Sequence, residues 1–168
     1  MKSFLKSKWF IFIFYSVVVL TLTALQSTPH LFEIFGVKPM LLLPFALAVA
    51  IHKGEIAGAG ISVVCGLLFD ISIASPFGAY AFLFMVFGVA TGLLSRLLLQ
   101  KAWFNYCVLV FISSFLIQFF DFFFNFILYG YTDIFAIFLT HHLPCVIYTT
   151  LISPIFYFLT AKIYKVNF

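Results

Sequence analysis

The sequence predicts an all-α membrane protein with six transmembrane helices, and three observations support this fold class. Of the 168 residues, 65% are hydrophobic and only 8% are charged, whereas a water-soluble domain carries about 25% charged residues. The apolar residues form six runs that are separated by short polar turns. The Lys and Arg residues gather on one side of the membrane if all six runs cross it. We therefore expect a single multi-pass domain covering residues 1–168.

The first two runs need separate arguments. The first follows three lysines and resembles a secretory signal, but it exceeds the roughly 7–15 apolar residues of a cleaved one, and no small-residue cleavage site follows. We expect it to be retained as a span. The second run is only 13 residues long, so by length alone it also fits a re-entrant segment. It contains Pro44, which is expected to bend or break the helix.

The other four runs are long enough to cross a bilayer. The third follows the polar turn His52–Glu55, and the fourth follows Ser75–Gly78. The fifth is rich in phenylalanine, and the sixth contains two prolines, Pro144 and Pro154. The expected spans cover residues 9–25, 39–51, 56–73, 77–99, 102–129 and 134–164.

The positions of the basic residues decide whether the short second run crosses. If it does, and both termini are cytoplasmic, the inside holds eight of the nine basic residues and the outside holds only Lys38; the eight are Lys2, Lys6, Lys8, Lys53, Arg96, Lys101, Lys162 and Lys165. If it does not cross, the split becomes three inside and six outside, against the positive-inside rule. The sequence therefore favours six spans.

Small residues recur every four positions in the third run. Four residues turn an α-helix by about 400°, so such a series forms a slanted ridge. We name this series, Gly54, Gly58, Ser62 and Gly66, the glycine ridge, and a shorter pair, Gly88 and Gly92, lies in the fourth run. Small residues at this spacing let membrane helices approach closely. We expect both sets to form a helix-packing interface, within the protein or with a partner protein.

Asp70 continues the four-residue spacing and ends the ridge near the outer surface. A carboxylate at this depth needs a partner, because hydrocarbon tolerates it poorly. Two interpretations remain open: Asp70 contacts a partner protein or the adjacent loop, or it accepts hydrogen bonds from the turn at Ser72–Ser75.

A second group of polar residues lies on one face of the fifth run. At 100° per residue, this polar face places its members within about 60° of one another; they are Ser114, Gln118, Asp121 and Asn125. His141 and His142 lie at a similar depth in the sixth run, and we hypothesise that one of them pairs with Asp121. The cluster fits an interhelical lock between the fifth and sixth helices, a proton-linked or substrate-binding site, or a partner contact.

Several function classes find no support in the sequence. No phosphate-binding glycine loop, HExxH motif or nucleophile elbow is present. The three cysteines lie in apolar runs without metal-ligand spacing, so we expect small buried side chains. Asp70 with Asp121 is a weak signal for intramembrane proteolysis. We expect no enzyme activity, no cofactor, no bound metal and no nucleic-acid partner, and the lipid bilayer as the surroundings.

Four short motifs follow one another between Val37 and Arg96. They are Lys38-Pro39-Met40-Leu41-Leu42-Leu43, then Gly54-Glu55 with Gly58, then Gly66-Leu67-Leu68-Phe69-Asp70, then Pro76-Phe77-Gly78. Their order and spacing, with the chain length, the six expected spans and the minimal loops, resemble the bacterial rod shape-determining MreD family.

This resemblance implies a non-enzymatic subunit of the cell-elongation machinery in the bacterial cytoplasmic membrane. Such proteins associate with MreC, a single-span protein, and through it with cell-wall synthases and MreB. The implied fold is similar to the substrate-binding subunits of energy-coupling-factor vitamin transporters. By carry-over, Gly58, Gly66 and Asp70 belong to a packing segment. The alternative is a vitamin-type substrate-binding subunit of a transporter, with the polar face lining its pocket.

Overall fold

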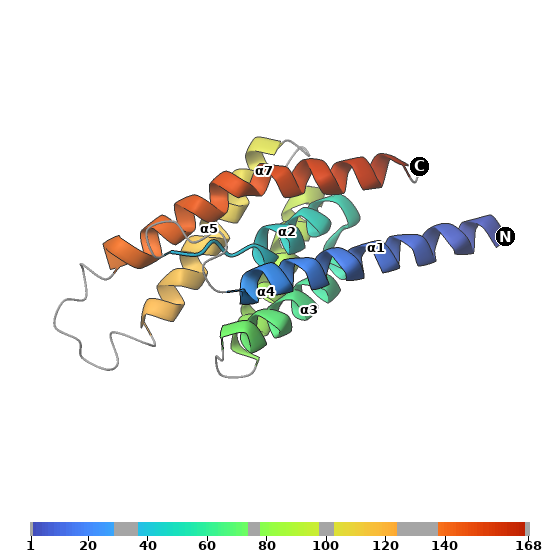
Figure 1. The fold of residues 1–168 in the computed structure, drawn as a ribbon. Helices are drawn as coiled ribbons and strands as arrows, with labels where there is room; N and C mark the ends of the chain where they lie inside the picture. The colour runs from blue at the N-terminus through green and yellow to red at the C-terminus, as the bar shows by residue number, and fades with distance from the viewer. Residues whose placement is uncertain (1, 29–36, 74–77, 98–102, 124–137, 167–168) are drawn as a thin grey trace.

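The computed structural model describes residues 2–28, 37–73, 78–97, 103–123 and 138–166, with the backbone alone for residues 2–12, 97 and 165–166. The regular elements within these residues are helices, as the sequence predicts (Figure 1). They are α1 (Lys2–Ser27), α2 (Leu42–Lys53), α3 (Glu55–Ile73), α4 (Ala79–Leu97), α5 (Trp103–Phe122), the π-helix η2 (Phe138–His142) and α7 (Leu143–Val166).

Four helical segments within the described residues are long and apolar enough to cross a membrane. They are Glu55–Ile73, Ala79–Arg96, Trp103–Phe122 and the continuous stretch Phe138–Tyr164. The outward faces of these helices are apolar: Ile56 is 85% exposed and Leu151 is 72% exposed. Large exposed apolar surfaces mark contact with lipid or with other proteins. The helices therefore indicate a membrane protein.

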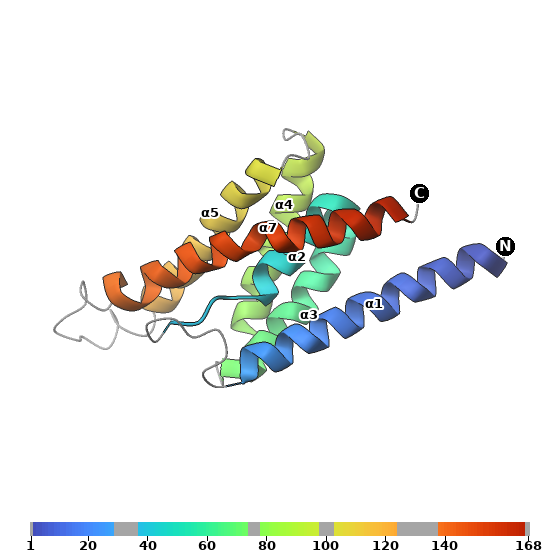
Figure 2. The same ribbon diagram turned by 45° about the horizontal axis from the view of Figure 1, so that its top comes forward.

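Helix α2 is the centre of the bundle. Its side chains from Leu42 to Ala50 are all buried, and the ribbon lies between α1 and α7 in both views (Figures 1 and 2). The ring of Phe45 stacks edge-on between Tyr15 of α1 and Phe156 of α7, with centroid distances of 6.0 and 6.3 Å. Tyr106 of α5 donates a hydrogen bond of 2.7 Å to the Pro44 carbonyl. A helix buried on every side explains why this run is apolar without an amphipathic period.

The second expected span is only partly helical. Residues 38–40 have no regular structure, and the helix begins at Leu42, so Pro44 lies in the first turn. Proline is tolerated there because the first N–H groups of a helix have no intrahelical partner. The expectation that Pro44 bends or breaks a helix is therefore wrong, and the helix starts three residues later than the apolar run.

The ends of the helices define two sides of the bundle. At one side, Lys53 lies over the ring of Tyr15 at 4.4 Å, and His52 lies 6.0 Å from the ring of Tyr164. Both chain termini extend toward this side (Figure 1). At the other side, the hydroxyls of Ser27 and Ser72 are 3.1 Å apart. We call the first the basic end, because Lys53, Arg96 and Lys162 close their helices there, and the second the Lys38 end.

The two prolines of the sixth run are accommodated differently. The π-helix η2 meets α7 one residue before Pro144, where a proline ring cannot continue the regular hydrogen-bond ladder. Pro154 lies inside α7 and cannot donate to the carbonyl of Thr150. The hydroxyl of Ser153 donates to this carbonyl instead, at 2.7 Å. Residues 77, 98–99, 102, 124–129 and 134–137 of the expected spans lie outside the described residues.

Candidate functional site

The glycine ridge lies where α3 contacts α2 and α4. A Cβ atom placed on Gly58 would lie 2.5 Å from the Cβ of Ala50 in α2. One placed on Gly66 would overlap the Cα of Ala81 and lie 2.8 Å from its nitrogen, in α4. Real Cβ atoms do not make contacts this short, so the backbones can be this close only because these residues are glycine. The ridge residues are thus covered by helices of the same chain.

The glycines of α4 face the same contact from the other side. A Cβ on Gly88 would collide with the hydroxyl of Ser62, and one on Gly92 would lie 2.5 Å from the Cα of Glu55. Ser62 is fully buried and fills the space that Gly88 leaves. Each helix therefore packs its atoms against glycines of the other, and α3 and α4 approach each other as closely as the spacing of their glycines predicts.

The basic end of this contact is held by an ion pair. Arg96 of α4 donates to Glu55 of α3 at 2.6 Å. Gly54 joins α2 to α3 with a φ of +90°, a conformation in which a side chain would be strained. The arginine lies 3.6 Å from a Cβ built on Gly54. The end of α2 and the start of α3 therefore meet at a turn that requires glycine at position 54.

Asp70 caps the next helix. Its carboxylate accepts hydrogen bonds from the backbone N–H groups of Gly78, Tyr80 and Ala81, at 2.9, 3.1 and 3.4 Å. These groups lie at the start of α4, where helix N–H donors lack internal partners and the helix dipole favours a negative charge. Asp70 is 1% exposed. The carboxylate therefore bonds to the start of α4, and residues 74–75 of the turn Ser72–Ser75 lie outside the described residues.

The polar face of α5 points into the bundle. Ser114 and Gln118 are buried. The amide of Gln118 donates to the sulfur of Cys145 at 2.8 Å, and its oxygen lies 2.7 Å from Nδ1 of His142. Both partners belong to the last helical segment, so Gln118 links α5 to α7 within the membrane. Asn125 lies outside the described residues.

Asp121 has a partner that the sequence did not indicate. The hydroxyl of Tyr80 in α4 donates to its Oδ1 at 2.6 Å. His142 faces Gln118 through Nδ1, while His141 is exposed. The direct pairing of Asp121 with a histidine stays a prediction. The sequence does not predict this pairing, because Tyr80 lies 41 residues away in another apolar run.

The segment before α2 is held by side chains from distant helices. The N–H of Met40 donates to the hydroxyl of Thr149 at 3.0 Å, and the N–H of Leu41 donates to Gln26 at 3.1 Å. The thiol of Cys145 donates to the carbonyl of Lys38 at 3.1 Å. Non-helical backbone at membrane depth persists only where protein groups satisfy it. These side chains of α1 and α7 therefore satisfy the backbone of the non-helical segment before α2, which we call the unwound segment.

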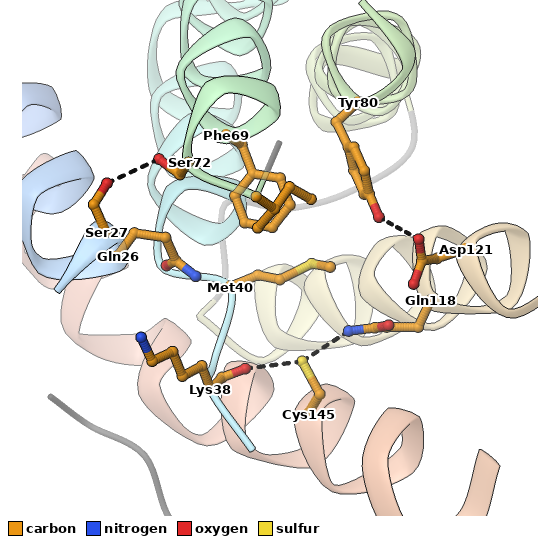
Figure 3. Close-up of a pocket in the computed structure, with 11 residues that line it drawn as sticks. Gln26, Ser27, Lys38, Met40, Phe69, Ser72, Tyr80, Gln118, Asp121 and Cys145 are labelled. Carbon is orange, nitrogen blue, oxygen red and sulfur yellow. Dashed lines mark hydrogen bonds between the residues drawn. The ribbon is translucent and has the colours of Figure 1, made fainter. Parts of the chain in front are cut away.

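A pocket of about 290 Å³ opens at the Lys38 end (Figure 3). Every described helical segment except α2 and η2 contributes to it, as does the unwound segment. Its polar lining residues are Gln26, Ser27, Lys38, Ser72, Tyr80, Gln118 and Asp121, and its apolar ones are Met40, Phe69, Ile73 and Cys145. We call it the polar pocket. Two members of the predicted polar face, Gln118 and Asp121, thus line a cavity, whereas the glycine ridge does not.

The two aspartates near the polar pocket each accept hydrogen bonds from described residues. Asp70 is engaged in the cap of α4, and Asp121 is bonded to Tyr80. Across the residues that the structure describes, no three His, Cys, Asp or Glu side chains are grouped in a way that would hold a metal ion. The arrangement supports hydrogen bonding and helix packing.

Comparison with known proteins provides an independent finding. The sequence profile of a family described as rod shape-determining protein MreD matches residues 5–166. No curated protein and no solved structure matches the chain. The family match extends from within α1 to the end of α7, so it covers the glycine ridge, the polar face and the polar pocket.

Proposed function

The chain belongs to the MreD family of rod shape-determining proteins, and from this premise we propose that it is a non-enzymatic scaffold subunit of the bacterial cell-elongation machinery. In this proposal it binds an MreC-like single-span protein in the cytoplasmic membrane. MreC in turn links it to cell-wall synthases and MreB. The observation that carries the proposal is the family match along residues 5–166 of a helical membrane protein.

The proposed topology has six crossings with both termini in the cytoplasm. The described basic side chains support it, since Lys53, Arg96 and Lys162 lie at the end of the bundle toward which both termini extend (Figure 2). Lys38 lies at the opposite end. Helix α1 has 26 residues, or about 39 Å at 1.5 Å per residue, enough to cross about 30 Å of hydrocarbon.

The second crossing combines two conformations. The 12 residues of α2 span about 18 Å, and the four residues from Val37 to Met40 add about 13 Å where they are extended. Together they reach the thickness of the hydrocarbon core. The short run can therefore cross without a full-length helix, which agrees with the six-span interpretation.

The architecture also supports a scaffold role for the glycine ridge. Its small residues join α2, α3 and α4 into a closely packed unit, and Asp70 fixes the start of α4. In this proposal the ridge is the internal helix-packing interface, and the partner binds the outward apolar faces. A rigid unit presents those faces in one arrangement, which lowers the entropic cost of binding.

The test is co-purification together with cell shape. The tagged full-length chain, expressed with an MreC-like single-span protein, is expected to retain it through detergent purification. Depletion of the chain from its rod-shaped host is expected to give round cells. Gly66→Leu is expected to reduce the yield of the complex, because a bulky side chain separates α3 from α4. Rods that persist after depletion, with no partner retained, would contradict the proposal.

The polar pocket favours one second candidate, the substrate-binding subunit of a transporter. The pocket contains Gln118 and Asp121 of the polar face, and its volume lies at the lower limit of ligand sites, about 300–1,000 Å³. The fold similarity to energy-coupling-factor substrate-binding subunits, which the family resemblance implies, is compatible with this candidate. It predicts that cells lacking the chain lose uptake of a labelled vitamin and keep their shape. The scaffold predicts the reverse.

A further inference from the structure

The polar pocket contains the one basic residue that the six-span topology leaves outside. Eight of the nine Lys and Arg residues fall on the cytoplasmic side in this topology, and Lys38 lines the pocket at the other end. Its ammonium donates to the backbone carbonyl of Thr28 at 2.7 Å. Among the described residues no carboxylate lies within ion-pair distance of it. A lysine ammonium has three donors, so Lys38 can also bind an anion.

Two side chains on the wall around Lys38 can donate hydrogen bonds to a ligand, Lys38 itself and Gln26. The amide oxygen of Gln26 accepts from Leu41, so the group that Gln26 can offer to a ligand is its NH₂. The hydroxyl of Ser72 donates to the Leu68 carbonyl at 2.8 Å, so the hydroxyl of Ser27, 3.1 Å away, donates to Ser72, and both protons are used within the protein. Lys38, Gln26 and Ser27 lie on one side of the pocket in Figure 3. This wall suits a phosphate or a carboxylate.

The opposite wall carries the complementary charge. Figure 3 shows Asp121 and Tyr80 across the pocket from Lys38, with Met40 and Phe69 between them. The Tyr80 hydroxyl donates to one oxygen of Asp121, and a carboxylate has about four acceptor positions. Asp121 therefore offers a negative charge opposite the ammonium of Lys38, and opposite charges attract.

We propose that the polar pocket binds a zwitterion, whose phosphate or carboxylate lies at Lys38 and whose ammonium lies at Asp121. The two walls separate the charges of the ligand, and Met40 and Phe69 contact its short apolar link. The volume of about 290 Å³ is that of about ten water molecules in the liquid, enough for phosphoethanolamine or a small amino acid. The source is a free zwitterion or the headgroup of phosphatidylethanolamine, and the proposal does not depend on the scaffold function.

The experiment measures thermal unfolding of the purified full-length chain against ligand concentration. Free phosphoethanolamine is added to the chain in detergent, and phosphatidylethanolamine is supplied in nanodiscs of otherwise anionic phosphatidylglycerol. A ligand that binds only the folded state raises the midpoint with the logarithm of its concentration. Phosphocholine and phosphatidylcholine are the matched ligands, because their methylated nitrogen cannot donate a hydrogen bond to Asp121.

Two pocket variants and one control complete the design. Asp121→Asn keeps an acceptor for Tyr80, and Lys38→Gln keeps a donor for Thr28, so both preserve the main hydrogen bonds. Each is expected to weaken the apparent affinity at least tenfold. Lys162→Gln removes an exposed charge at the basic end and is expected to leave the affinity unchanged.

The outcomes distinguish a soluble ligand from a lipid headgroup, and they also include results that would overturn the proposal. Stabilisation by free phosphoethanolamine supports a soluble ligand, and stabilisation by phosphatidylethanolamine alone supports a lipid headgroup. The proposal is overturned if neither ligand raises the midpoint, or if the choline forms act equally well. It is also overturned if the pocket variants respond as the Lys162→Gln control does. The choline comparison uses the unaltered chain, so it decides even if a variant fails to fold.

Discussion

Single glycines determine how closely the helices of this protein approach. Gly66 faces the backbone of Ala81, whereas Gly60, six residues earlier in the same helix, has no atom within 4 Å of a built Cβ. The two residues have the same helix propensity. They differ in their surroundings alone, so they form a matched pair for testing the packing of α3 on α4.

We expect Gly66→Ala to lower the free energy of unfolding by about 1–3 kcal/mol, the usual cost of overpacking a tight contact. Gly60→Ala is expected to leave stability unchanged or to raise it by up to about 1 kcal/mol, since alanine favours helix more than glycine does. Reversible unfolding in mixed micelles measures both. Equal effects of the two substitutions would show that the short approach at Gly66 does not contribute.

At the scale of elements, the unwound segment before α2 is the feature that depends most on distant side chains. Met40 and Leu41 have their N–H groups bonded to Thr149 and Gln26. Thr149 is 1% exposed, and its neighbour Thr150 donates only to the carbonyl of Val146 in its own helix. The two threonines therefore allow the contribution of the distant bond to be separated from that of the residue type.

Thr149→Val is expected to cost about 1–3 kcal/mol, because it leaves the N–H of Met40 buried without an acceptor. Thr150→Val is expected to change stability by less than about 0.5 kcal/mol, as substitutions away from such bonds do. Thermal midpoints of the two purified variants, compared with the unaltered chain, decide this. A similar loss in both would indicate that valine itself disturbs α7.

The sequence predicts helices well here and their terminal contacts poorly. Hydropathy and four-residue spacing are local signals, and they locate α3, α4 and α5 and the small residues between α3 and α4. The unwound segment was missed because its acceptors, Thr149 and Gln26, lie 109 and 15 residues away along the chain. The length of the second run and Pro44 alone fit either a membrane span or a re-entrant segment.

The same distinction applies to the candidate site. Period-based reasoning placed Gln118 and Asp121 on one face of the fifth helix, and the structure shows both lining the polar pocket. It did not find Tyr80, Gln26 or Lys38, which reach the pocket from three other segments. Whether residues of different helices line one pocket depends on the angles at which the helices pack. A hydropathy pattern carries no information about these angles.

For the whole molecule, the distribution of basic residues gives a direct prediction of orientation. Lys53 lies at the basic end and Ile73 at the Lys38 end, and both side chains are exposed. With six crossings, a membrane-impermeant maleimide is expected to label Ile73→Cys in cells with an intact cytoplasmic membrane. Lys53→Cys should react only after lysis. The unaltered chain is the control, because Cys65 and Cys145 are buried and Cys107 is half-buried. Labelling of Lys53→Cys from outside would reverse the assignment.

The central position of α2 has a consequence for biosynthesis. The helix emerges from the ribosome early, yet Phe156, Tyr157 and Thr149, which contact it or the segment before it, belong to the last helix. Until translation nears its end, the apolar side chains of α2 lack the residues of α7 that cover them in the folded protein. They must then be shielded by lipid or by the insertion machinery. The native core of this protein therefore closes only after synthesis of α7, and C-terminal truncation would leave the earliest buried helix incompletely covered.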